Sequence, residues 1–123
     1  MLTIKPIENE IEIKAYLSAQ GIILENVPRQ FMAMYDGNEI CGLGALTLEE
    51  AKVYMDFLHV SGDTSLLFGL AKSLLNMADL RGIKTIYGKN PALENTYTAL
   101  HFKKDEGEFV LSLEGYFTVP CAH

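Results

Sequence analysis

The chain has 123 residues, of which 49% are hydrophobic and 21% are charged, and its formal net charge is −6. This length suits a single domain over residues 1–123, and the composition is that of a globular protein rather than a disordered one. The ten Lys and Arg residues are scattered, which argues against nucleic acid as the main partner, because neutralising phosphates requires clustered cations.

The chain shows no signal for membrane insertion, export or metal binding. Its apolar runs are too short to span a bilayer, and residues 1–7 lack the charged, apolar and small-residue order of a signal peptide. Cys41 and Cys121 lack metal-ligand spacing. Two cysteines that look unpaired fit a reducing compartment. We therefore expect a cytoplasmic protein with no metal and no membrane partner, in which Cys121 is a silent thiol of an exposed tail.

The first half predicts one strand, one helix and then three antiparallel strands. Asn9 and Glu12 form a capping-box pattern that starts the helix, and Gly21 ends it as a left-handed C-cap. Residues 22–30 predict a loop or a single turn, and residues 36–38 have the turn chemistry of a hairpin. The four strands are expected at residues 2–5, 31–35, 39–47 and 51–60.

The strand at residues 51–60 leads into a long helix. Asp63 or Thr64 is the expected N-cap, and the helix runs to about Arg81. The next strand is expected at residues 83–87, so the strand–helix–strand unit should be a right-handed parallel crossover. Strict alternation along residues 51–60 predicts two faces. One face holds Tyr54, Asp56, Leu58 and Val60, and the opposite face holds Val53, Met55, Phe57 and His59.

A capped helix that carries a tyrosine follows, and a terminal hairpin is expected at residues 102–117. Asn90 is a natural N-cap, because its side-chain oxygen can accept a hydrogen bond from an orphan N–H group. Leu93, Tyr97 and Leu100 fall on one face at helical spacing. A tyrosine at the edge of such a face can pack its ring and present its hydroxyl to a cleft. The alternative is a core tyrosine near the surface.

This order of elements resembles the GNAT superfamily of acetyl-CoA-dependent N-acetyltransferases. The family commonly shows an Asn, a Tyr seven positions later, and a Gly-Phe pair that ends the helix. Asn90, Tyr97 and His101-Phe102 stand at these places. Residues 74–86 look like the family's long central helix and the strand after it. The resemblance spans nearly the whole chain and implies a mixed α/β (α+β) domain, with a mostly antiparallel sheet, one parallel β-α-β crossover and flanking helices.

The resemblance implies direct transfer of an acetyl group from acetyl-CoA to a primary amine, with the cofactor between strands 51–60 and 83–87. Tyr97 would be the general acid for the departing thiolate. Asp56, the one carboxylate in its strand, would be the base; the alternatives are an exposed strand residue or a structural acceptor. The implied cofactor-binding residues are the backbone of Leu58, His59 and Val60, the loop residues Thr64, Ser65, Leu66, Leu67 and Phe68, and Asn90 and Tyr97.

The loop that should hold the pyrophosphate departs from the family pattern. Gly62 replaces a basic or amide residue, Ser65 and Leu67 replace two glycines, and Asp63 adds an acidic group. The helix N-terminus still offers N–H donors, while a missing Arg would cost about 1.5–3 kcal/mol, or one to two decades of affinity. The alternative is that Asp63 simply caps the helix. The chain would then be a catalytically degenerate GNAT-fold module for binding or dimerisation.

The part of the predicted site that would bind the acceptor has one helix fewer than the family usually has. The family usually has two helices between its first and second strands, and one clear helix fits between Pro6 and Gln30. We expect an acceptor pocket that is open or completed by a second subunit. The degenerate module would instead pair as a homodimer through the terminal hairpin around Tyr116 and Phe117. The acceptor would be a small-molecule or peptide amine. The three histidines are expected in structural places: His59 in the core, His101 at a helix end and His123 in a disordered terminus.

Overall fold

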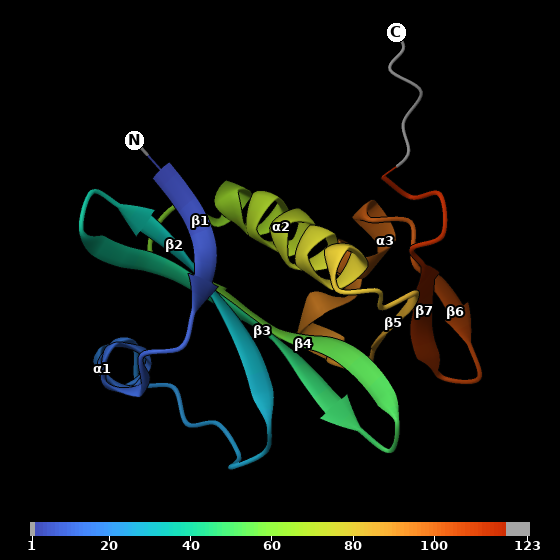
Figure 1. The fold of residues 1–123 in the computed structure, drawn as a ribbon, viewed down its shortest axis with the longest axis horizontal. Helices are drawn as coiled ribbons and strands as arrows, with labels where there is room; N and C mark the ends of the chain where they lie inside the picture. The colour runs from blue at the N-terminus through green and yellow to red at the C-terminus, as the bar shows by residue number, and fades with distance from the viewer. Residues whose placement is uncertain (1, 118–123) are drawn as a thin grey trace, which may run out of the picture.

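The computed structural model describes residues 2–117, which form a twisted seven-stranded sheet with helices on both faces (Figure 1). In chain order the elements are β1 (Leu2–Ile7), α1 (Glu10–Ala19), β2 (Arg29–Asp36), β3 (Glu39–Glu49), β4 (Lys52–Val60), α2 (Leu67–Leu80), β5 (Thr85–Gly88), α3 (Glu94–Ala99), β6 (Lys103–Asp105) and β7 (Glu108–Ser112). Short 3₁₀ turns at Thr64–Leu66 and Pro91–Leu93 precede α2 and α3.

The strand order is β1-β2-β3-β4-β5-β7-β6, in which β4 and β5 pair in parallel and the other neighbours pair antiparallel. This is the mostly antiparallel sheet with one β-α-β crossover that the sequence predicts. The single helix between β1 and β2 is also confirmed, with a loop from residue 20 to 28. No helix within residues 2–117 is long and apolar enough to cross a membrane. The expectations for Cys121 and His123 fall outside these residues.

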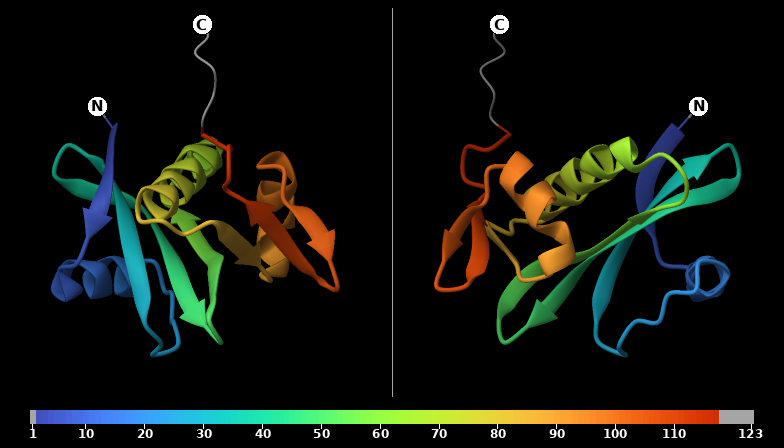
Figure 2. Two further views of the ribbon diagram at one scale, coloured as in Figure 1. Left: turned by 45° about the vertical axis from the view of Figure 1, so that its right-hand side comes forward. Right: turned by 180° about the vertical axis from the view of Figure 1, so that it is seen from behind.

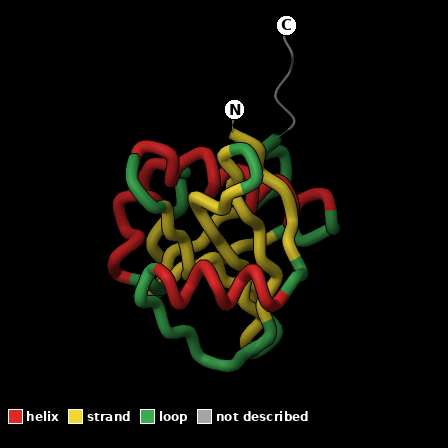
Figure 3. Tube along the Cα trace, turned by 90° about the vertical axis from the view of Figure 1, so that its left-hand side faces the viewer, coloured by secondary structure: helices red, strands yellow, loops and turns green. Residues whose placement is uncertain are grey.

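The two long helices cover opposite faces of the sheet (Figure 2). Leu74 and Leu70 of α2 are fully buried against β3, where Gly44 permits the close approach. A Cβ atom at Gly44 would lie 2.6 Å from Leu74 Cδ1. On the other face, Ile13 and Tyr16 of α1 join a smaller apolar cluster with residues of β2 and β3. Figure 3 faces α1 and shows it running across the strands.

Left-handed residues end the helices where the sequence places breaks. Gly82 follows α2 with a φ of 82°, a conformation that glycine adopts without steric cost. His101 follows α3 with a φ of 73°, and so holds the helix-ending position that favours glycine. The expectation that His101 terminates a helix is therefore confirmed.

A bulge in β4 changes which of its residues share a face. The β3–β4 register shifts where β4 contributes two residues, Met55 and Asp56, against one residue of β3. Such an insertion interrupts the alternation of side chains along a strand. Leu58 and Val60 accordingly pack in the core beneath α2, whereas His59 lies on the face that α1 covers. The prediction that Leu58 and Val60 share a face with Asp56 is therefore wrong, because it assumed an unbroken alternation. The predicted placement of Leu58 and Val60 opposite His59 agrees with the structure.

Candidate functional site

The candidate site is the junction where β4 and β5 separate. These strands pair at a single register position. Beyond it, two backbone carbonyls at the β4 bulge accept hydrogen bonds from side chains. The Tyr97 hydroxyl donates to the Met55 oxygen at 2.7 Å, and the Asn90 Nδ2 donates to the Asp56 oxygen at 2.8 Å. The bulge in one strand and the segment after the other therefore form one polar junction.

Asn90 has two structural functions at this junction. Its Oδ1 accepts a hydrogen bond from the Ala92 N–H at 3.0 Å, which caps the turn that leads into α3. Its Nδ2 holds β4 through the Asp56 carbonyl. The predicted N-cap is confirmed, and the same side chain fixes the turn against the sheet.

Tyr97 is fully buried at the centre of the junction. Its ring lies 5.1 Å from the rings of Phe102 and Phe109 and packs directly on Gly88. Burial raises the pKa of its phenol to about 12, so the hydroxyl is a protonated donor at neutral pH. In this structure that donor faces the Met55 carbonyl rather than an open cleft.

The loop at the start of α2 is capped by its own carboxylate. Asp63 accepts a hydrogen bond from the Ser65 N–H at 3.0 Å, and hydrogen bonding by Ser65 lowers the pKa of Asp63. Asp63 is thus the N-cap, one of the two residues predicted for that place. An anion that approached the start of α2 would be repelled by the negative charge of Asp63, and it would find the Ser65 N–H already occupied. The structure puts Thr64, Ser65 and Leu66 in the 3₁₀ turn and Leu67 and Phe68 in the first turn of α2.

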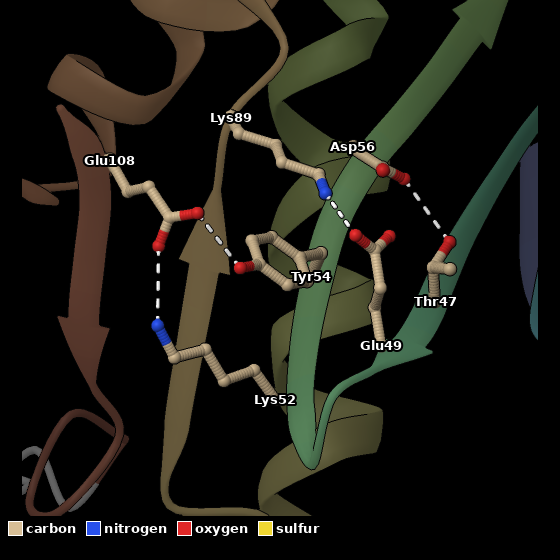
Figure 4. A network of polar contacts seen from close by, with 7 residues as sticks. All are labelled: Thr47, Glu49, Lys52, Tyr54, Asp56, Lys89 and Glu108. Atoms are coloured by element: carbon tan, nitrogen blue, oxygen red, sulfur yellow. Dashed lines mark hydrogen bonds and ion pairs between the residues drawn. The ribbon is translucent and has the colours of Figure 1, made fainter.

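Asp56 lies on the face opposite α2, in a network of polar side chains (Figure 4). Its Oδ1 accepts a hydrogen bond from the Thr47 hydroxyl at 3.1 Å, so a structural acceptor role is present. Nearby, Lys89 forms an ion pair with Glu49. This pair is not predictable from the sequence pattern, because its partners are 40 residues apart and meet through the β3–β4 hairpin and the end of β5.

A second part of this network joins β4 to β7. The Tyr54 hydroxyl donates to Glu108 at 2.8 Å, and Lys52 pairs with the same carboxylate at 3.5 Å. The Lys89 Nζ lies 4.4 Å from the centre of the Tyr54 ring, within the range of cation–π attraction. Two cations and two carboxylates thus surround one tyrosine beside the junction.

We expect the Tyr54–Glu108 bond to make stability depend on pH. The bond is the first cause of the lowered pKa of Glu108, whose ordinary value is 4.5. A lowered pKa in the folded state gives stability that is present above the ordinary value and is lost as pH falls through the folded value. Tyr54→Phe should therefore destabilise the protein more at pH 7 than at about pH 3, as measured by urea unfolding at both pH values.

The matched control for this prediction is Tyr87→Phe. Tyr87 packs against Tyr54 with its ring, and its hydroxyl has no described hydrogen bond within residues 2–117. Its variant should show the same effect at both pH values. An equal pH dependence of the two variants would contradict the role given to Glu108.

The aromatic pair that follows β7 is engaged within the chain. The Tyr116 hydroxyl donates to the Leu100 oxygen at 3.0 Å, and its ring lies 4.9 Å from that of Phe117. Lys72 of α2 lies within 6 Å of both ring centres. A homodimer through these residues stays a prediction.

Searches with the sequence found no matching family model and no matching curated protein. The structure, in contrast, resembles many solved structures. One is an N-acetyltransferase from Staphylococcus aureus Mu50, with 16% identity, a TM-score of 0.72, and coverage of 93% of this chain and 99% of that chain. A GNAT-family acetyltransferase from the same organism has 14% identity, a TM-score of 0.64, and coverage of 92% and 99%.

A third similar structure is a GNAT-family acetyltransferase from Elizabethkingia anophelis with acetyl-CoA bound. It has 12% identity, a TM-score of 0.62, and coverage of 91% of this chain and 98% of that chain. These likenesses extend over nearly the full length of both chains in each comparison. The chain therefore has the fold of the GNAT superfamily of acetyltransferases.

Proposed function

We propose that this chain is a GNAT-type N-acetyltransferase, which transfers the acetyl group of acetyl-CoA directly to a primary amine. The observation that carries the proposal is the β4–β5 junction, where a bulged strand presents two carbonyls beside a protonated tyrosine. Amide N–H groups of an extended ligand can bond to such carbonyls in the manner of an added strand. The pantetheine arm of acetyl-CoA is a ligand of this kind.

In the proposed reaction, the neutral amine attacks the thioester carbonyl, a C–N bond forms and the C–S bond breaks. Asp56 takes the proton that the amine loses, and Tyr97 gives a proton to the departing sulfur. One oxygen of Asp56 is held by Thr47, which would orient the carboxylate for this transfer. Tyr97 can act as the proton donor because its phenol is protonated at neutral pH and its hydroxyl lies at the β4 bulge.

Cofactor binding would require Tyr97 to exchange its partner. Its hydroxyl now bonds to the Met55 carbonyl, and breaking one neutral hydrogen bond costs about 0.5–1.5 kcal/mol net. The freed carbonyl would then accept an N–H of the pantetheine arm, and the hydroxyl would turn to the thioester sulfur. Because one hydrogen bond replaces another, the bond between Tyr97 and Met55 is compatible with binding of acetyl-CoA.

The second candidate is a GNAT-fold module that does not bind acetyl-CoA and acts in binding or dimerisation. Asp63 favours it, because a carboxylate at a helix N-terminus occupies an N–H donor and repels phosphates. The enzyme proposal includes an acceptor that is a small-molecule or peptide amine, a cytoplasmic location, and neither nucleic acid nor membrane as partner. The net charge of −6 and the scattered Lys and Arg residues favour a cationic acceptor and argue against nucleic acid.

Calorimetric titration with acetyl-CoA, combined with transfer assays on a panel of amines, separates the two candidates. We expect saturable binding to the wild type and affinity about two- to fivefold higher for Asp63→Asn. Asparagine can keep the bond to the Ser65 N–H while it removes the charge, and a charge near a helix terminus contributes about 0.3–1 kcal/mol. Acetyl transfer to any amine would rule out the module.

The matched control is Asp105→Asn, which removes an equal charge from an exposed position on β6. Its affinity for acetyl-CoA should equal that of the wild type. Absence of binding by the wild type and by Asp63→Asn at millimolar acetyl-CoA would overturn the enzyme proposal and leave the module.

A further inference from the structure

The two arginines of this chain line one cavity, although they are 52 residues apart in sequence. Arg29 is the first residue of β2, and Arg81 follows the last turn of α2. The cavity has a volume of about 320 Å³ and lies between these two ends and the connection from β1 to α1. Two elements that are distant in the chain thus bring both guanidinium groups to one place.

The same cavity is lined by two carboxylates, Glu8 and Glu10. Within residues 2–117, the recorded ion pairs join Lys52 to Glu108, Lys84 to Asp79 and Lys89 to Glu49. Neither arginine and neither of these two glutamates belongs to such a pair. Two positive and two negative groups therefore line one cavity, and none of them belongs to an ion pair within the described residues.

Each arginine has N–H donors that no described residue occupies. The Arg29 Nη1 donates to the backbone carbonyl oxygen of Glu25, and the Arg29 Nε is buried with no hydrogen-bond partner within the described residues. The Arg81 Nη1 donates to the Gln30 Oε1. A guanidinium has five N–H donors, so each side chain has several to offer. A carboxylate is the ligand that matches this planar fork, often with two parallel bonds.

We propose that this cavity binds a small zwitterion, namely a free α-amino acid. Its carboxylate would bind Arg29 and Arg81, and its ammonium would bind Glu8 and Glu10. Its side chain would lie against the apolar part of the lining, formed by Pro6, Ile7, Ile13 and Phe31.

Charge selects this class over simpler ions. The two glutamates repel a phosphate dianion, and the two arginines repel a simple amine. A molecule with both charges on adjacent groups satisfies both pairs. The lining contains no residue of β4, β5 or α3, so the proposed site is separate from the β4–β5 junction, and it does not depend on the proposed acetyl transfer.

The first experiment is a calorimetric titration of the wild type with each common L-amino acid, at up to about 20 mM. We expect saturable binding of at least one of them. The best ligand is then compared with its N-acetyl derivative, its carboxamide and inorganic phosphate. Each blocked derivative should bind about tenfold more weakly or worse, because each loses a charge-assisted interaction, and phosphate should not bind.

Variants test the assigned residues. Arg81→Gln and Glu10→Gln change exposed side chains and should each weaken binding of the best ligand about tenfold. Lys84→Gln is the matched control, since Lys84 lies outside the cavity and pairs with Asp79 at 3.6 Å; it should bind like the wild type. Thermal melts verify that the variants are folded.

Three results would each overturn the inference. The first is the absence of binding by every amino acid at about 20 mM, and the second is phosphate binding as tight as that of the amino acid. The third is unchanged affinity in folded Arg81→Gln and Glu10→Gln. Acetyl-CoA titrations of the same variants are independent of these outcomes, because they report on the other site.

Discussion

Replacing Tyr97 by phenylalanine should lower kcat for acetyl transfer by about 10²–10⁴-fold, the usual contribution of a positioned proton donor, with a much smaller change in the Kd for acetyl-CoA. The departing thiolate would lose its proton source, while the ring would keep its packing against Phe102 and Phe109. Stability should also fall, by about 1–3 kcal/mol, because the buried Met55 carbonyl loses its donor. Steady-state kinetics, calorimetry and urea unfolding measure the three effects.

The matched control for Tyr97→Phe is Tyr116→Phe. Tyr116 also donates its phenol O–H to a backbone carbonyl, that of Leu100 at 3.0 Å, but it lies outside the junction. It should lose stability in the same way and keep its kcat. A Tyr97→Phe enzyme with wild-type kcat would show that another group protonates the thiolate, and the role given to Tyr97 would be wrong.

Local rules were sufficient to predict the segment around Asn90. Its N-cap, its short helix and the break at His101 each depend on interactions within a few residues, and each is present in the structure. The same holds for the cap at Asp63. Their success reflects the short sequence distances between the groups that make these bonds.

The face assignment of β4 failed because it depends on a neighbouring strand. Whether Leu58 points toward α2 is decided by the bulge at Met55 and Asp56, and a bulge is defined by register against β3. The alternating pattern of a single strand does not indicate whether that strand has an extra residue relative to the strand with which it pairs.

Contacts between residues that are distant in the chain could likewise not be predicted from the sequence. The cavity that Arg29 and Arg81 both line and the ion pair between Glu49 and Lys89 depend on where strands and helices end in space. In the sequence these charged residues are far apart and form no pattern that predicts their contacts. The fold was therefore predictable from element order and resemblance, whereas the charged sites required the structure.

Gly88→Ala should destabilise the protein by about 1–3 kcal/mol or more, as overpacking of a core does. A Cβ atom at this position would lie 2.3 Å from Tyr97 Cζ and 2.5 Å from its Cε1. The ring has little room to withdraw, because two phenylalanines pack on it and its hydroxyl is bonded to β4. Urea unfolding of the variant measures the loss, and acetyl transfer should fall with it, since the displaced ring moves the proposed donor.

Gly69→Ala is the control that isolates this contact. Gly69 lies in α2, and a Cβ atom added there would point into open space, so alanine should stabilise the protein by about 0.5–1 kcal/mol through helix propensity. Opposite signs for the two substitutions would show that the effect at Gly88 comes from Tyr97 and not from the loss of a glycine. Equal effects would contradict the packing of Tyr97 on Gly88, and with it the anchoring of the proposed proton donor between β4 and β5.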